Sequence, residues 1–208
     1  MSSERISAGG IVLCGGQSKR MGRPKAWLPF GDETMLERVV RILSKVVQPI
    51  VVVAAPEQDV PPLPPEVLLT RDEEKGKGPL QGLSAGLRVL SERVEAAYLS
   101  SCDVPLLRPA FVRRMLSLLG QHSICVPHVD GFHHPLAAVY RVDILAQVNR
   151  LLAENRLRPI FLFETVPTRL VEPQELLDID PNLQSLRNLN TPEDYEQALR
   201  DLKRVKHG

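Results

Sequence analysis

The sequence predicts an α/β fold with three αβα layers around a mostly parallel, mixed sheet. Short apolar runs rich in β-branched residues alternate with stretches whose apolar residues recur at helical spacing. A hairpin-turn signal, Asp130-Gly131, interrupts this alternation and predicts an antiparallel excursion. With 208 residues, 43% of them hydrophobic and 25% charged, the chain is expected to form one domain over residues 1–208.

The elements follow from periodicity and from residues that start or stop helices. Strands are expected at 10–13, 50–54, 67–70, 96–100 and 123–126, with a further extended run at 134–140 after the turn. Helices are expected at 34–44, 80–90, 109–119 and 142–154. The proline-rich stretch 56–65 predicts a surface connection. Thr191 before Pro192, with acids following, predicts the start of a C-terminal helix.

Composition excludes several classes of function. The net charge is +1, from 26 basic and 25 acidic residues, which argues against an extended nucleic-acid footprint. No run approaches membrane-spanning length and the N-terminus lacks a secretory pattern, so a cytoplasmic location without a membrane is expected. Three widely spaced cysteines do not predict disulfides, and Cys14, Cys102, His133 and His134 lack the spacing of a zinc site.

The segment after the first expected strand concentrates glycines and cations. It runs from Leu13 through Gly15-Gly16 and Arg20 to Lys25. Paired glycines let main-chain N–H groups approach an anion, and Arg20 and Lys25 can neutralise phosphate charge, so a triphosphate is the natural ligand. The spacing matches neither a dinucleotide-binding fingerprint nor a P-loop. Taken alone, the glycine pair is more often a simple turn.

Two acids lie where strands are expected to end. Asp103 follows the apolar run 96–100, at the sheet edge where ligands bind in open α/β folds. Its carboxylate suits Mg²⁺ held jointly with a triphosphate, although capping the next turn explains it equally well. Asp72 follows the run 67–70 and precedes a glycine-rich stretch ending in Gly78-Pro79, which on residues alone is the start of a helix.

These strings resemble the molybdenum cofactor guanylyltransferases. The family signature Leu-x-Gly-Gly-x-x-x-Arg-Met-Gly-x-x-Lys is met by Leu13, Gly15, Gly16, Arg20, Met21, Gly22 and Lys25. A second marker, Gly-Pro-Leu-x-Gly, is met by Gly78, Pro79, Leu80 and Gly82. Cys102-Asp103 followed by Pro105 and the run from Asn188 through Asn190 to Asp194 match two further elements. One departure is that 51–56 contains no asparagine, where the family often has one that contacts the nucleotide.

The resemblance implies a Rossmann-like, nucleotide-diphospho-sugar transferase-like domain that transfers GMP from GTP to molybdopterin and releases pyrophosphate. It implies Arg20, Lys25 and Asp103 as catalytic residues, with Asp103 as the ligand of Mg²⁺. Nucleotide contacts are implied for Leu13, Cys14, Gly15, Gly16, Lys25, Asp72, Gly78, Pro79, Leu80, Gly82, Asp103, Asn188 and Asn190. The N-terminal half would bind nucleotide and the C-terminal half, with His133-His134, would face the pterin.

Other interpretations remain open from the sequence. A cytidylyltransferase or sugar-phosphate nucleotidyltransferase would share much of the first motif, and a non-catalytic nucleotide-binding adaptor that delivers cofactor would share the loop. Arg156 and Arg158 follow the expected helix 142–154 and either contact a substrate phosphate or stabilise the helix end. Expected partners are GTP, molybdopterin, other cofactor-biosynthesis proteins and recipient molybdoenzymes.

Overall fold

The computed structural model of this chain describes residues 6–15, 23–72 and 77–206. Its main sheet runs in the order β10-β7-β9-β6-β1-β4-β5, with β8 paired to β7. The strands are β1 (Ala8–Leu13), β4 (Ile50–Ala54), β5 (Leu68–Arg71), β6 (Ala96–Ser101), β7 (Ile124–Val129), β8 (Phe132–His133), β9 (Ala137–Arg141) and β10 (Thr168–Val171). Strand β9 pairs antiparallel with both β6 and β7, whereas the β1, β4, β5 and β6 pairings are parallel. The sheet is therefore mixed and mostly parallel, as predicted.

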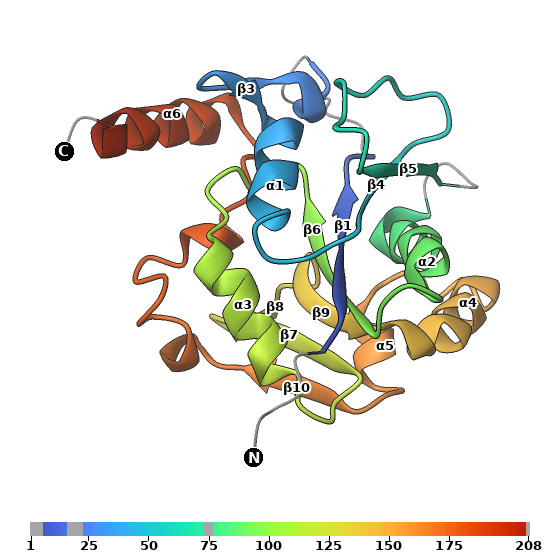
Figure 1. Cartoon of the computed structure of the whole chain (residues 1–208). Coiled ribbons are helices and arrows are strands. Elements are labelled where there is room, and N and C mark those ends of the chain that lie inside the picture. The colour runs from blue at the N-terminus through green and yellow to red at the C-terminus, as the bar shows by residue number, and fades with distance from the viewer. Residues whose placement is uncertain (1–5, 16–22, 73–76, 207–208) are drawn as a thin grey trace.

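Helices cover both faces of this sheet, as Figure 1 shows. On one face lie α1 (Met35–Leu43) and α3 (Pro109–Leu118), and on the other lie α2 (Gly78–Leu90) and α4 (Leu145–Ala153). Successive side chains of a strand point to opposite faces of the sheet and enter two separate apolar clusters. Val12 thus packs with α1, while Ile11 packs with α2. Three layers result, because a parallel sheet must bury both faces.

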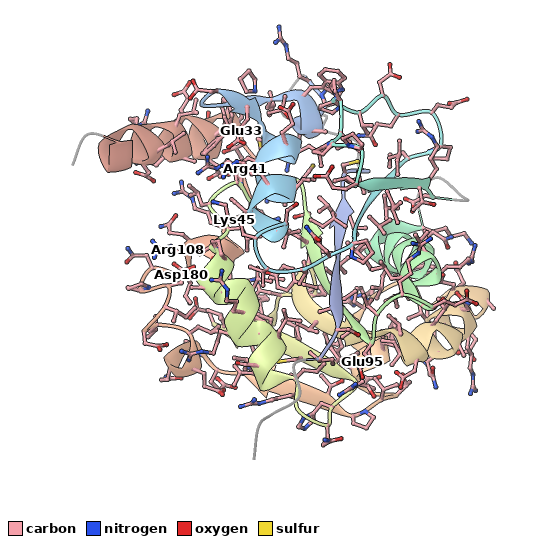
Figure 2. All side chains as sticks on the ribbon, in the orientation of Figure 1. Glu33, Arg41, Lys45, Glu95, Arg108 and Asp180 are labelled. Carbon is pink, nitrogen blue, oxygen red and sulfur yellow. The ribbon has the colours of Figure 1, made fainter. Side chains whose placement is uncertain are left out.

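A third apolar cluster joins the two ends of the chain. The hairpin of β2 (Pro29–Phe30) and β3 (Glu33–Thr34) packs against α6 (Pro192–Lys206), with Phe30 and Ala198 fully buried. Figure 2 shows Glu33 and Arg41 side by side, and Glu33 also accepts a hydrogen bond from Arg38, so two arginines of α1 anchor the hairpin. The hairpin follows directly after a short 3₁₀ turn, η1 (Lys25–Trp27). The C-terminal helix thus supports the segment that carries Lys25.

Several start signals read from the sequence operate as predicted. Thr191 accepts a hydrogen bond from the Asp194 N–H, and Asp194 accepts one from the Thr191 N–H, so α6 begins at Pro192. Asp130 and Gly131 both have positive φ and join β7 to β8. The end of the expected run 134–140 becomes β9, which pairs back on β6. Within the described ranges, no helix has the length and apolar character needed to cross a membrane.

Several short elements were not predicted. Among them are the β2–β3 hairpin, the short helix α5 (Ile160–Phe163), strand β10 at the sheet edge, and the 3₁₀ turns at Lys25–Trp27, Pro173–Glu175 and Gln184–Leu186. The expected helix 142–154 is divided, since its first turn is 3₁₀ and α4 begins only at Leu145. Short elements of this kind depend on their packing partners more than on local periodicity.

Candidate active site

The candidate site lies at the carboxyl edge of the parallel strands. Because β1, β4, β5 and β6 run parallel, the residues that follow them meet at one edge: Gly15 after β1, Asp72 after β5 and Asp103 after β6. The chain leaves β1 toward β4 on one side and later returns to β6 on the other. Such a topological switch point is where open α/β sheets bind ligands.

Lys25 and Asp103 form the centre of this edge. The Lys25 Nζ lies 2.6 Å from Asp103 Oδ2 and 2.7 Å from the side-chain oxygen of Asn190. The Lys25 and Asp103 side chains are 17% and 13% exposed, so the ion pair is largely shielded from water. The glycine-rich segment, the end of β6 and the approach to α6 therefore converge on one ammonium group.

The second oxygen of Asp103 is held by neutral donors. Asn188 Nδ2 donates to Asp103 Oδ1 at 2.8 Å, and Ser101 Oγ donates to the same atom at 2.5 Å. The main chain is fixed as well, since the Leu189 N–H donates to the Asp103 carbonyl and the Cys102 N–H to the Leu13 carbonyl. The carboxylate of Asp103 thus has one oxygen bound to neutral groups and one facing a cation.

These oxygen donors fit a divalent metal ion. A carboxylate oxygen of Asp103 and an amide oxygen of Asn190 both face the same cationic nitrogen, and hard ions such as Mg²⁺ prefer ligands of these two kinds. The Lys25 ammonium therefore stands where a cation is favoured. Among the residues that the structure describes, no group of three or more histidine, cysteine, aspartate or glutamate side chains could hold a metal by itself. A metal here would need further ligands from a substrate.

Asp72 forms a second polar position on the β5 side of the glycine loop. A Cβ on Gly15 would lie 3.6 Å from Asp72 Oδ2, and one on Gly82 would lie 3.5 Å from Oδ1, so both glycines border the carboxylate. Asp72 Oδ1 is buried and has no hydrogen-bond partner within the described part of the chain. Burial raises the pKa of Asp72 to about 6. A hydrogen-bond acceptor that is shielded from solvent and lacks a partner indicates a ligand that donates hydrogen bonds.

Gln58 holds the main chain at Cys14, just before the glycine pair. Its Nε2 donates to the Cys14 carbonyl at 2.8 Å, and its Oε1 accepts from the Ala55 N–H at 3.2 Å. Arg71 donates to the carbonyls of Ala55 and Gln58, which fixes the turn. Segment 51–56 lacks the asparagine typical of the resembled family, and the nearby amide that the structure provides binds the loop's main chain.

A cavity of about 210 Å³ opens on the other side of Asp103. Its lining comprises Val104, His133, His134, Pro135, Leu136, Ala137, Ser185, Leu186 and Asn188. Burial lowers the pKa of His133 and of His134, which favours their neutral forms.

Asp180 is fully buried and accepts main-chain hydrogen bonds from Gln184 and Ser185, and Figure 2 shows it beside Arg108, its ion-pair partner at 3.4 Å. The Asp180 carboxylate thus fixes the main chain at Ser185, which lines the cavity.

The other residues singled out from the sequence are placed as follows. Gly16 and Arg20 lie outside the described residues. Gly78 and Pro79 begin α2, and Leu80 is fully buried in the core, so only its main chain could face a ligand. Leu13 packs against Gly82, and the buried Cys14 thiol donates to the Val53 carbonyl.

Arg156 makes local contacts on the protein, and the three cysteines are buried in the core. Arg156 pairs with Glu154 and Glu164 and stacks on Phe161, so its contacts are local. Burial raises the pKa of the Cys14 and Cys125 thiols to about 12, and that of Cys102 rises as well. All three cysteines are free and buried. No disulfide links them, in agreement with the sequence prediction.

Two residues at the site were not identified from the sequence. Ser101 carried one signal, its position at the end of a strand two residues before Asp103. Gln58 carried none, because it lies inside the proline-rich connection.

The chain is similar in sequence and in fold to known proteins. Residues 10–168 match the family model of the MobA-like NTP transferase domain. A Mycobacterium ulcerans protein named "Probable molybdenum cofactor guanylyltransferase" is 35% identical over 95% of this chain and 96% of its own length. A Mycobacterium avium protein of the same name is 38% identical over 73% of this chain and 78% of its own. The crystal structure of molybdopterin-guanine dinucleotide biosynthesis protein A from Archaeoglobus fulgidus superposes with a TM-score of 0.79 at 21% identity, covering 94% of this chain and 99% of that one. The chain therefore belongs to the MobA-like NTP transferase family.

Proposed function

We propose that this protein is a molybdenum cofactor guanylyltransferase, which transfers GMP from GTP to molybdopterin. One observation carries the proposal: Lys25, Asp103 and Asn190 converge between the cavity at His134 and the carboxylate of Asp72, whose Oδ1 has no hydrogen-bond partner among the described residues. The relatives named above support the choice of reaction and substrates. The N-terminal half then binds the donor nucleotide and the C-terminal half, through the cavity, faces the acceptor.

Asp72 is proposed to recognise the guanine base. The Watson–Crick edge of guanine presents two adjacent donors, the N1–H and the exocyclic amine, and an ionised carboxylate accepts from both. Cytosine presents one donor, its exocyclic amine, beside the acceptors N3 and O2, so a carboxylate that accepts from the amine would face the lone pair of N3 instead of a second donor. Asp72 follows β5 and Asp103 follows β6, three strand spacings or roughly 14 Å apart along the sheet. The base and the polyphosphate can therefore occupy opposite ends of the same edge.

Lys25 is proposed to change partners when the nucleotide binds. In the present structure it neutralises Asp103 Oδ2, but an arriving triphosphate offers several anionic oxygens. Lys25 would then turn to those oxygens and release Asp103 Oδ2 and the Asn190 amide oxygen, which are the groups that would hold Mg²⁺. The ion, when bound, supplies positive charge that offsets the charge on the phosphates. Arg20 and the Gly15-Gly16 main chain complete the proposed phosphate contacts.

The chemistry requires little beyond position and charge. An oxygen of the acceptor's terminal phosphate attacks the α-phosphorus of GTP, and the bond from that phosphorus to the bridging oxygen of the β-phosphate breaks. Pyrophosphate leaves, and the acceptor carries the transferred GMP. Both nucleophile and leaving group are anionic phosphates, so the protein contributes alignment and neutralisation more than proton transfer.

The test is pyrophosphate release by the purified protein with molybdopterin, Mg²⁺ and each of the four nucleoside triphosphates. Guanylylated product with GTP alone is expected. Product with CTP in place of GTP would overturn the assignment and favour a cytidylyltransferase. An adaptor that only binds nucleotide predicts no pyrophosphate with any triphosphate and no functional effect of Asp103→Asn. A loss of turnover in Asp103→Asn with folding preserved would exclude the adaptor.

A further inference from the structure

The two oxygens of the Asp103 carboxylate have different partners. Oδ2 faces the Lys25 ammonium at 2.6 Å, whereas Oδ1 accepts from Ser101 Oγ at 2.5 Å and from Asn188 Nδ2 at 2.8 Å. An ionised carboxylate only accepts hydrogen bonds, so the Ser101 hydroxyl must be the donor in its contact. Asn188 Nδ2 also reaches Ser101 Oγ, at 3.4 Å, which links the two donors to one another. Oδ1 is thus occupied by the protein and Oδ2 is reserved for a cation.

Ser101 is suited to this task by its place in the fold. It is the last residue of β6, is 7% exposed, and pairs in register with Leu13 at the end of β1. Its neighbour Ser100 is fully buried and its hydroxyl donates to the Ser101 carbonyl; within the described part of the chain, no hydrogen bond joins it to Asp103. Two serines of the same strand therefore differ in one respect that matters, since only Ser101 touches the carboxylate.

We propose that Ser101 is a positioning residue, which fixes Asp103 so that it offers a single oxygen to the divalent cation. The inference rests on the proposed role of Asp103 as the metal ligand. Mg²⁺ requires nearly ideal octahedral geometry, whereas Ca²⁺ accepts a carboxylate through both oxygens at once. A carboxylate whose Oδ1 is held by Ser101 and Asn188 binds through Oδ2 alone, so the site favours Mg²⁺ over Ca²⁺. Hydrogen bonds of this kind commonly change metal affinity by about 10- to 100-fold.

The test compares Ser101→Ala with Ser100→Ala, which removes a buried hydroxyl from the same strand without touching Asp103. Mn²⁺ binding is followed by electron paramagnetic resonance in the presence of a GTP analogue with a methylene between the α- and β-phosphates, and Mg²⁺ and Ca²⁺ are titrated as competitors. In Ser101→Ala we expect Mn²⁺ affinity to fall about tenfold. The preference for Mg²⁺ over Ca²⁺ should also narrow several-fold. Ser101→Thr, which keeps the hydroxyl, should restore both quantities, and Ser100→Ala should match the wild type.

Wild-type affinity and selectivity in folded Ser101→Ala would overturn the proposal, as would equal losses in both alanine variants. If Ser101→Ala does not fold, Ser101→Cys is measured in the same way, because its thiol has a similar size and is a weak donor. The Asp103→Asn variant separates the role of Ser101 from the proposed role of Asp103 as a metal ligand. If Asp103→Asn binds Mn²⁺ normally, the metal assignment itself fails; if only Asp103→Asn loses the ion and Ser101→Ala does not, the role of Ser101 fails alone.

Discussion

Replacing Lys25 by methionine tests whether its ammonium competes with a metal for Asp103. At 2.6 Å and an effective dielectric constant of about 20, the attraction between the two charges is about 6 kcal/mol before desolvation is subtracted. Desolvation offsets most of this attraction in a largely buried pair. If about 1.4 kcal/mol of net attraction between Lys25 and Asp103 remains, a metal ion must overcome it to bind Asp103. Removing it corresponds to a tenfold gain in metal affinity. Lys25→Met should therefore bind free Mn²⁺ about tenfold more tightly than the wild type.

The same variant should behave in the opposite way once nucleotide is present. With the methylene analogue of GTP, the lost phosphate contact should weaken nucleotide binding about 100-fold, since hydrogen bonds to charged groups are worth roughly 1.5–3 kcal/mol. Lys45→Met serves as the control, because Lys45 is exposed and lies away from the site. Paramagnetic resonance with Mn²⁺ and calorimetry with the analogue measure the two affinities. If Lys25→Met binds free Mn²⁺ no more tightly than the wild type, the partner exchange is refuted.

Four further outcomes are expected. Asp72→Asn should lower kcat/KM for GTP about 100-fold in pyrophosphate-release assays, whereas the affinity for CTP in calorimetry should not fall; an equal loss of affinity for both nucleotides would contradict base recognition. In the wild type, KM for GTP should rise as pH falls through about 6, because protonated Asp72 loses an acceptor; a flat KM between pH 5 and 7 would argue against this. His134→Ala should raise KM for the acceptor and leave GTP affinity unchanged in calorimetry; an unchanged KM for the acceptor would show that the cavity does not bind it. Gly86→Ala should lower the free energy of unfolding in urea by about 1–3 kcal/mol, because its Cβ would lie 2.7 Å from buried Ile11; unchanged stability would show that Ile11 moves aside easily.

The raised pKa of Asp72 also has a consequence for stability. Its pKa in the folded protein, about 6, lies above the ordinary value of 3.8, so the folded state holds this proton more tightly than the unfolded state does. The corresponding stability is fully present below pH 3.8 and is lost as pH rises through about 6. Asp72→Asn should therefore melt at or above the wild-type temperature at pH 7.5, with the gap closing near pH 4. The protein keeps a carboxylate that costs stability, as expected of a binding group.

The fold could be predicted from the sequence wherever local signals agree with the final packing. Strand β4 is a run of β-branched residues and β6 begins with a short apolar run, and both strands are buried along their whole length, so continuous hydrophobicity located them. Strand β10 has only four residues, carries Arg169, and forms by pairing with the edge of β7. Its sequence does not distinguish it from a loop, because the partner supplies the hydrogen bonds that define it.

The site was predictable to a smaller extent. The motifs indicated that Lys25 and Asp103 act on the same ligand, and the structure brings them into direct contact. That Lys25 binds the carboxylate itself could not be read from spacing, because the two residues are 78 positions apart. Ser101 and Gln58 were missed for a related reason, since a hydroxyl or an amide becomes important only through the partner that folding gives it.

The C-terminal segment is part of the candidate active site. Three consecutive residues, 188–190, contact the Lys25–Asp103 ion pair through the Asn188 side chain, the Leu189 N–H and the Asn190 side chain. Leu189 is also fully buried in the cluster that joins α6 to the hairpin after Lys25. We therefore expect a shift of α6 to displace Leu189 relative to the hairpin. Such a displacement would change the distance between Lys25 and Asp103. A charge arrangement that depends on distances below 3 Å is maintained here by an apolar core, because packed side chains resist displacement more than surface hydrogen bonds do.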